Sequence, residues 1–258
     1  MPRKVEISGL SKMFGTPEVL RSIDLAVEQG EFIAVVGPSG CGKTTFLRMV
    51  AGLEPATSGT ILLDGKPLAG PGNNRGFVFQ NDSLLPWRTV LSNALIGPEL
   101  AGSVGSAERQ RTLDLLKLVG LGGFENYYPR QLSGGMRQRV NLARALAIDP
   151  DVLLMDEPFA SLDAQTREIM QTELLRIWEQ GRKTVLFVTH SIEEALLVGS
   201  RILVLSPHPG RVKAELNADH LGFSDIGTPA FETLHRRIHD LLFADRVETA
   251  LATEIQHG

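Results

Sequence analysis

The sequence predicts an α/β fold in which a parallel sheet core carries an antiparallel β subdomain and an inserted helical subdomain. Residues 3–36 and 60–68 alternate or run apolar, with tight-turn signals at Gln29-Gly30 and Asp64-Gly65, as expected of an antiparallel layer. From residue 32 onward, strand-like and helix-like segments alternate, which is the order of a parallel sheet with helices on both faces.

The later elements follow in order along the chain. Strands are expected over residues 32–37, 76–79, 152–156, 184–189 and 201–206. Helices are expected over residues 43–51, closed by Gly52, over 163–180, closed by Gly181, and over 191–198, with a helix-rich stretch from 89 to 147.

The sequence predicts one large domain followed by a small C-terminal appendage. We expect the domain over residues 1–213, with the helical subdomain at about 88–147, and a C-terminal helical appendage over 214–258. In the appendage, Thr228 is the expected cap of an amphipathic helix whose first turn contains Pro229. His235 and His239 have a metal-compatible spacing there, with Glu232 as the one further ligand in reach, but a solvated helix face is the favoured interpretation.

Composition excludes several classes of protein. The chain has 258 residues and 43% apolar residues, enough for a real core, and its 26 basic against 30 acidic residues argue against nucleic-acid binding. The single cysteine excludes an intramolecular disulfide, and the start MPRKVEISG lacks the apolar core of a secretory signal, so we expect the cytoplasm. Residues 193–207 are apolar but interrupted, so a membrane role requires a partner.

A phosphate-binding loop is predicted at "GPSGCGKT", between an apolar strand and a helix. Its glycines let backbone N–H groups turn toward phosphates at a helix N-terminus. Lys43 would reach the terminal phosphates and Thr44 would place its hydroxyl on Mg²⁺, while Cys41 is interpreted as a small spacer. The expected nucleotide-binding residues are Gly37, Pro38, Ser39, Gly40, Cys41, Gly42, Lys43, Thr44 and Thr45.

Two consecutive carboxylates, Asp156 and Glu157, end the strand "DVLLMDEP". Adjacent strand residues point to opposite faces, so the two acids should have different roles. We expect Asp156 to hold Mg²⁺ and Glu157 to face the attacking water as its base or its orienter. Alone, the pair could also be the end of a strand that leaves the core.

Two further strand ends carry polar side chains. His190 follows the strand 184–189 at the edge where open α/β sheets bind ligands, and Ser191 with Glu194 forms a capping box for the next helix. Gln80 follows the strand 76–79, where its amide could ligate Mg²⁺ or position water. The alternatives are a loop histidine and an exposed glutamine without such roles.

A second glycine turn, Ser133-Gly134-Gly135, opens a helix with Met136 and Val140 on one face, followed there by Ala143 and Ala147. Its amide donors, serine hydroxyl and positive dipole end suit a terminal phosphate. No lysine is needed, because the phosphate would arrive with Lys43. The alternative is a plain N-capped helix.

Six motifs in this order resemble the nucleotide-binding subunit of an ATP-binding cassette (ABC) transporter, a P-loop NTPase with a RecA-like core. They are residues 37–44, Gln80, 132–136, 153–158, 161–163 and His190, and the resemblance covers residues 3–213. It implies a head-to-tail homodimer in which ATP with Mg²⁺ lies between one subunit's phosphate loop and its partner's Ser133 and Gly135. It further implies that Phe14 stacks on adenine, in place of the more frequent tyrosine, and that Asp163 lines the dimer seam. Met136 departs from the family's usual glutamine.

Within that family, residues 73–94 and 132–164 resemble the importer branch serving nitrate, sulfonates and taurine. The resemblance implies a transmembrane permease partner, an indirect extracytoplasmic solute-binding protein, no nucleic acid, and a peripheral location at the cytoplasmic face of the plasma membrane. Leu84, Leu85 and Trp87 lie where the family meets its permease, and exposed apolar residues there would form a docking surface. The alternative places Trp87 in the core of the helical subdomain.

Two other functions remain open at this point. An ABC-type ATPase acting on chromosomes or ribosomes would usually carry a coiled-coil insertion, a basic arm or tandem cassettes, none of which the sequence has. A small-molecule kinase with the same phosphate loop offers no reason for the second glycine turn.

Overall fold

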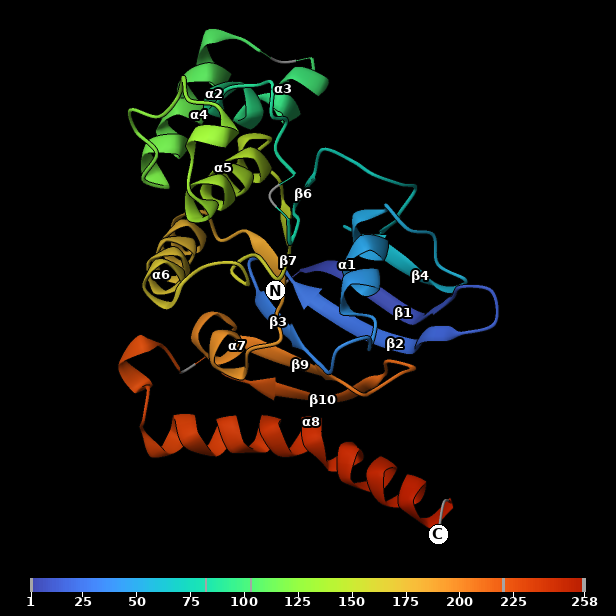
Figure 1. The fold of residues 1–258 in the computed structure, drawn as a ribbon. Coiled ribbons are helices and arrows are strands. Elements are labelled where there is room, and N and C mark those ends of the chain that lie inside the picture. Colours follow the sequence, from blue (N-terminus) through green and yellow to red (C-terminus); the bar gives the residue numbers. More distant parts are fainter. Residues whose placement is uncertain (1, 82, 103, 220, 257–258) are drawn as a thin grey trace. The chain divides into compact units, whose positions relative to one another are not determined.

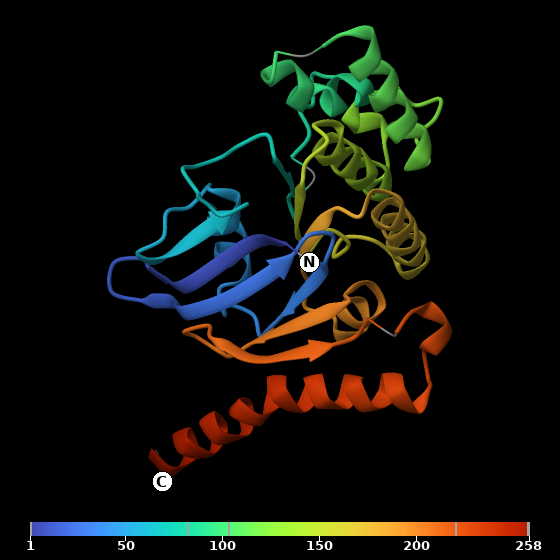
Figure 2. The ribbon, with the colours of Figure 1, turned by 180° about the vertical axis from the view of Figure 1, so that it is seen from behind.

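The structure is a computed structural model that describes residues 2–81, 83–102, 104–219 and 221–256, with side chains through residue 243. The chain divides into two compact units (Figures 1 and 2). The first unit comprises Met1–Ala69 and Phe187–Gly258, and the second comprises Gly70–Leu186.

An antiparallel sheet forms the first half of the first unit. Its strands, in the order β2-β1-β4-β5, are β1 (Arg3–Met13), β2 (Glu18–Glu28), β4 (Ser58–Leu63) and β5 (Lys66–Pro67). Leu63 pairs with Lys66, and Asp64 (φ 50°) and Gly65 (φ 72°) between them both adopt left-handed backbone. This is the geometry of a two-residue hairpin turn, so the predicted Asp64-Gly65 turn and antiparallel layer are confirmed.

Parallel and antiparallel pairing meet in the rest of the first unit. β3 (Phe32–Val36) pairs parallel with β9 (Arg201–Leu205), and β10 (Val212–Asn217) pairs antiparallel with β9. Every residue of β3 is buried, as expected of a strand covered on both faces. The boundary expected at residue 213 falls inside β10.

Three helices complete the first unit. They are α1 (Lys43–Ala51), α7 (Ile192–Val198) and α8 (Pro229–Gln256), with a short 3-10 turn at Phe223–Asp225. Gly52 (φ 76°) closes α1 and the Thr228 hydroxyl accepts the Phe231 N–H at the start of α8, both as predicted. None of the helices in the described part of the chain is both long and apolar enough to cross a membrane.

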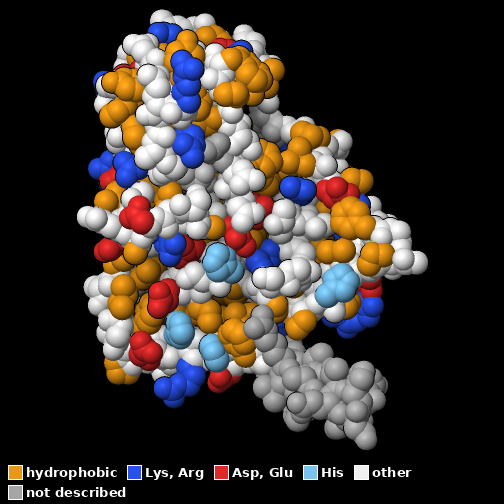
Figure 3. All heavy atoms as spheres, in the orientation of Figure 1, with side chains coloured by type: hydrophobic (Ala, Val, Ile, Leu, Met, Phe, Trp, Pro, Cys, Tyr) orange, Lys and Arg blue, Asp and Glu red, His pale blue; other side chains and the backbone are white. Residues whose placement is uncertain are grey.

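Over residues 229–243, helix α8 has both buried and exposed side chains. Phe231, Ile238 and Leu242 are buried. Figure 3 shows histidine, acidic and basic side chains together along its outer face. His235 stacks with Phe231, and His239 packs against Phe243. Among the described residues no group of three His, Cys, Asp or Glu side chains could hold a metal ion.

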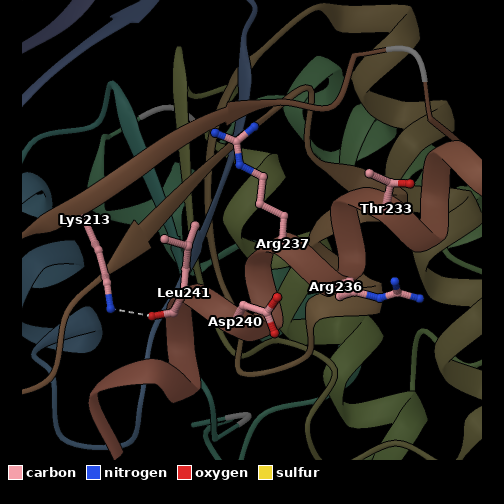
Figure 4. A pocket seen from close by; sticks show the side chains of 6 residues that line it. All are labelled: Lys213, Thr233, Arg236, Arg237, Asp240 and Leu241. Carbon is pink, nitrogen blue, oxygen red and sulfur yellow. Dashed lines mark hydrogen bonds between the residues drawn. The ribbon is translucent and has the colours of Figure 1, made fainter. Parts of the chain in front are cut away.

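A cavity of about 500 Å³ lies beside α8. The Lys213 ammonium, from β10, donates to the Leu241 carbonyl at 2.7 Å. In Figure 4 the guanidinium groups of Arg236 and Arg237 point in different directions. The charges of this cavity therefore do not converge on one point.

The second unit combines a parallel strand pair with helices. β6 (Arg75–Val78) pairs parallel with β7 (Val152–Asp156). The helices, visible as the cluster α2 to α5 and the separate α6 in Figure 1, are α2 (Val90–Ala94), α3 (Ile96–Leu100), α4 (Ser106–Leu118), α5 (Gly134–Ala147) and α6 (Ala164–Gly181), with a 3-10 turn at Pro129–Gln131. The helix-rich stretch expected over residues 89–147 is confirmed.

Strand β8 (Thr184–Val188) lies at the division of the chain. Its residues through Leu186 belong to the second unit, and Phe187 and Val188 belong to the first. All five are buried.

One predicted helix end is wrong. Gly181 is the last residue of α6, and Arg182 takes the left-handed position (φ 43°) expected of the glycine. The Arg182 N–H donates to the Trp178 carbonyl at 2.6 Å, and its guanidinium lies 4.7 Å from the centre of the Trp178 ring. This cation–π contact offsets part of the cost of left-handed backbone at a residue with a Cβ.

Candidate functional site

In the first unit the phosphate loop folds around its own lysine. Gly40 (φ 79°) and Gly42 (φ 98°) adopt left-handed backbone, and a Cβ at Gly42 would lie 2.8 Å from Leu20. Lys43 is 7% exposed, and its ammonium donates to the Gly37 carbonyl at 2.7 Å and the Pro38 carbonyl at 3.0 Å. The predicted strand, loop and helix are thus present, with the lysine inside the curve of the loop.

Cys41 is buried within this loop. Its Sγ lies 4.0 Å from the Lys43 ammonium, and a Cβ at Gly37 would approach Sγ to 2.6 Å. Burial raises the pKa of the Cys41 thiol, and the thiolate is the reactive form. The packing is therefore that of a small, unreactive spacer.

Two other predicted residues belong to the first unit. The Phe14 ring, just after β1, is 47% exposed, with the Lys12 ammonium 4.7 Å from the ring centre. His190 is exposed and follows Thr189 at the end of β8. The capping box expected after it is only half present: the Glu194 N–H donates to Ser191 Oγ at 3.2 Å, but the Glu194 carboxylate accepts from the Thr189 hydroxyl.

In the second unit, three predicted residues gather at the ends of β6 and β7. Asp156 is the last residue of β7 and is 4% exposed. The Gln80 amide donates to Glu157 Oε2 at 3.2 Å, which joins two residues 77 positions apart. The structure therefore brings Gln80 and Glu157 into direct contact.

The position of Glu157 differs from the one predicted from the alternation of strand faces. It lies outside β7 and has left-handed backbone with a φ of 44°, so the alternation of strand faces does not apply to it. Such a conformation costs a residue with a Cβ about 1–3 kcal/mol, and it is found most often where a side chain must be aimed. Glu157 is therefore part of the turn that follows β7 and not of the strand itself.

Helix α5 forms hydrogen bonds to residues on both sides of Gln80, an arrangement that the sequence did not predict. Asn141 is fully buried and donates to the Phe79 carbonyl at 3.1 Å, while Arg144 donates to the Ser83 carbonyl at 2.9 Å. Arg144 also donates to the Asn141 side-chain oxygen at 2.7 Å. One feature of the sequence could have indicated these contacts: the polar residue Asn141 follows Val140 on the buried face of the predicted helix.

The second glycine turn and Asp163 meet at one cavity of about 400 Å³. Ser133 caps α5, its Oγ accepting from the Met136 N–H at 3.2 Å, and Asp163 caps α6, accepting from the Thr166 N–H at 2.9 Å and hydroxyl at 2.8 Å. These bonds from Thr166 lower the pKa of the Asp163 carboxyl. Besides these residues, Gly134, Gly135, Arg139, Ser161 and Leu162 line the cavity.

The segment expected to meet a permease presents Trp87 to the surface. Trp87 is 71% exposed, so the alternative that places it in the helical core is wrong. Asn93 is fully buried and fixes this segment: its side chain accepts from the Leu85 N–H at 2.8 Å and donates to the Arg88 carbonyl at 3.0 Å. Leu84 and Leu85 are half-buried.

A glycine-rich loop that opens a helix, an acid pair after a buried strand and a second capped turn define a nucleotide-binding protein of the P-loop class. Residues 20–160 match the family described as ABC transporter. The chain belongs to this family, and it is an ATP-binding subunit with ATPase activity.

Curated relatives cover most of the chain. An uncharacterized ABC transporter ATP-binding protein of Methanocaldococcus jannaschii is 52% identical over 223 residues, which is 85% of this chain and 84% of the relative. The taurine import ATP-binding protein TauB of Escherichia coli O157:H7 is 50% identical over 212 residues, 82% of this chain and 83% of the relative.

Solved structures agree with the fold. A bacterial ABC transporter cassette in a dimeric structure has a TM-score of 0.76 at 33% identity, over 85% of this chain and 100% of that chain. A dimeric post-hydrolysis state of the same cassette, bound to ADP and Pi, has a TM-score of 0.74 at 34% identity, with the same coverage. The predicted α/β fold class is confirmed.

Proposed function

We propose that this chain is the ATP-hydrolysing subunit of an importer for a small sulfonate-type solute such as taurine or, in the same branch, nitrate. The observation that carries the proposal is 50% identity to a taurine import ATP-binding protein over 82% of the chain. It favours transport over the kinase and over an ATPase of chromosomes or ribosomes.

The phosphate loop is the part of the subunit that would bind ATP. Backbone N–H groups at the start of α1 and the Lys43 ammonium would bind the β- and γ-phosphates. The exposed Phe14 ring would stack on adenine, for which only a ring face is needed.

The proposed site residues include the oxygen donors that Mg²⁺ prefers. Asp156 supplies a buried carboxylate, Thr44 a hydroxyl and Gln80 an amide oxygen, and Mg²⁺ takes oxygen ligands with nucleotide phosphates completing its shell. When bound, the ion neutralises charge that develops on the phosphate oxygens.

Hydrolysis is assigned to Glu157, Gln80 and His190. Glu157 would accept a proton from the attacking water, and Gln80, which donates to Glu157 Oε2, would keep that carboxylate oriented toward the water. His190, exposed after β8, would stabilise the γ-phosphate as it leaves.

The Ser133 turn completes the site in a second copy of the chain. Two helix N-termini, those of α5 and α6, face the cavity that Ser133 and Asp163 line, and such termini attract phosphate oxygens. We therefore assign Ser133, Gly134 and Gly135 to the γ-phosphate held by the partner's Lys43, and Asp163 to the dimer seam.

Transport requires a permease, and Trp87 marks the surface for it. The exposed indole and neighbouring Leu84 and Leu85 would receive a cytoplasmic helix of the permease, which holds the chain at the cytoplasmic face of the membrane. The solute-binding protein would act through the permease alone.

Uptake of labelled solute tests this function. Cells that lack the chain are supplied with the wild-type protein or the Lys43→Ala variant, and uptake of taurine, an alkanesulfonate and nitrate is measured. We expect wild-type to restore uptake of one of these solutes and Lys43→Ala to restore none. Restoration by Lys43→Ala, or by neither protein for any of the three, would contradict the proposal.

A further inference from the structure

The turn that carries His190 is closed by a ring of buried and part-buried hydrogen bonds. Thr189 is 1% exposed, and its N–H donates to the Val35 carbonyl of β3 at 3.2 Å. Its hydroxyl accepts the Ser191 N–H at 3.1 Å and donates to Glu194 Oε2 at 2.5 Å. The Glu194 N–H donates in turn to Ser191 Oγ at 3.2 Å.

This ring fixes the residue on each side of His190. Thr189 is tied to strand β3 and to Glu194, and Ser191 is tied to Thr189 and to the start of α7, which packs on β3 (Figure 1). His190 itself is exposed. The Thr189 hydroxyl therefore ties together the two residues that flank His190.

The carboxylate in the ring occupies an unusual environment. Glu194 is 7% exposed, and burial of a carboxylate costs free energy unless hydrogen bonds compensate. A hydroxyl–carboxylate contact at 2.5 Å is at the short end of charge-assisted hydrogen bonds, which are about twice as strong as neutral ones. Glu194 also departs from an ordinary capping box, because its carboxylate turns to Thr189 instead of back to the Ser191 N–H.

We propose that Thr189 and Glu194 are positioning residues for His190, holding its backbone so that the imidazole meets the γ-phosphate in one orientation. The proposal rests on the function proposed above for His190. A displacement of about 1 Å at a reacting group can cost about 100-fold in rate, so loss of the ring should slow hydrolysis without weakening the binding of ATP.

The test is a double-mutant cycle between Thr189 and His190 in the full chain. Thr189→Val removes the hydroxyl and keeps the shape, Thr189→Ser keeps the hydroxyl, and His190→Ala removes the imidazole. For each variant, and for Thr189→Val combined with His190→Ala, kcat and KM for ATP are measured. Thr112→Val is the matched control, since Thr112 is also fully buried but its hydroxyl donates to the Glu108 carbonyl within α4.

We expect Thr189→Val to lower kcat by about 10- to 100-fold with KM changed less than about 3-fold, and Thr189→Ser to restore most of the rate. In the His190→Ala background, Thr189→Val should cause no further loss, because residues that act as one unit are not additive. The Thr112→Val control should keep the wild-type kcat.

Two outcomes would overturn the inference. One is a normal kcat for Thr189→Val, and the other is a fold-decrease of kcat from Thr189→Val that is the same in the wild-type and His190→Ala backgrounds. If Thr189→Val fails to fold, Glu194→Gln replaces it, with a smaller loss of about 3- to 10-fold that must also vanish in the His190→Ala background. A normal kcat for His190→Ala would instead refute the role proposed for His190, which separates the two failures.

Discussion

Glu157 combines the features that a positioned base requires: left-handed backbone at the end of a buried strand and a hydrogen bond from Gln80 at 3.2 Å. We predict that Glu157→Gln keeps ATP binding but lowers kcat by about 100-fold or more, because an amide cannot accept the proton of the attacking water. Steady-state hydrolysis and equilibrium binding of a labelled nucleotide measure the two effects. A variant that turned over at the normal rate would remove Glu157 from the mechanism.

Lys43 should act on binding instead. Its ammonium lies inside the phosphate loop, bonded to the Gly37 and Pro38 carbonyls, so Lys43→Ala removes a charge that the nucleotide phosphates need. We expect affinity for ATP to fall by about 10-fold or more, as for loss of a charge-assisted bond of about 1.5–3 kcal/mol. Unchanged affinity in the same binding assay would contradict the phosphate-loop assignment.

Asp163 links pH to stability at the start of α6. Hydrogen bonds from Thr166 lower its pKa below the usual value of about 3.9 for aspartate. A carboxyl whose pKa is lower in the folded chain contributes stability above its unfolded pKa, and this contribution is lost as pH falls through the folded pKa.

Asp163→Ala should therefore melt at a lower temperature than wild-type at pH 7, and the gap should narrow as the pH falls below about 4. Thermal melts across pH 3 to 7 measure this gap. Asp163→Asn is the control, because asparagine also caps helices but does not titrate, so its difference from Asp163→Ala should be constant with pH. A gap between wild-type and Asp163→Ala that stays the same across this range would contradict the pH dependence.

At the scale of elements, α5 does more than present the Ser133 turn. Through Asn141 and Arg144 it forms hydrogen bonds to the carbonyls of Phe79 and Ser83, the residues that lie on either side of Gln80. The buried position of Asn141 means that its loss leaves the Phe79 carbonyl with weaker pairing, as Gln138 reaches it only at 3.5 Å.

We predict that Asn141→Leu lowers the free energy of unfolding by about 1–3 kcal/mol, the cost of an unsatisfied buried polar group. Urea denaturation measures it, and hydrolysis should slow as well, since Gln80 loses its anchor. Gln110→Leu is a matched control, because the exposed Gln110 bonds only to Asp114 within α4 and its replacement should change stability by less than about 0.5 kcal/mol. If Asn141→Leu and Gln110→Leu unfolded at the same urea concentration, the hydrogen bonds of Asn141 would make no special contribution to the free energy of unfolding.

For the whole molecule, the proposed head-to-tail pair predicts complementation between two inactive variants. The Lys43→Ala variant has a phosphate loop that cannot bind nucleotide normally. The Ser133→Glu variant places a negative charge where the partner's γ-phosphate would lie. A mixed pair has one site with both defects and one site with neither. We therefore expect a mixture of the two variants to hydrolyse ATP faster than either variant alone, and no gain on mixing would show that each chain uses its own Ser133.

The chemistry of this chain was readable from its sequence because the relevant signals are local. The loop at residues 37–44, the Asp64-Gly65 turn and the caps at Ser133 and Thr228 each depend on residues a few positions apart, so spacing alone defines them. The order of strands and helices fixed the fold class for the same reason, since period and turn chemistry are properties of short segments.

Tertiary structure decided what depends on residues far apart in the chain. The left-handed turn at Glu157, the bond from Gln80 and the anchoring of Phe79 by Asn141 arise from packing between segments about 60 to 80 positions apart. Two further contacts that the sequence did not predict join nearby residues: Arg182 lies over the Trp178 ring four positions earlier, and Glu194 accepts from Thr189 five positions earlier. Propensity sets what a segment can form, whereas the hydrogen bonds that aim a side chain are chosen by whichever neighbours the fold supplies.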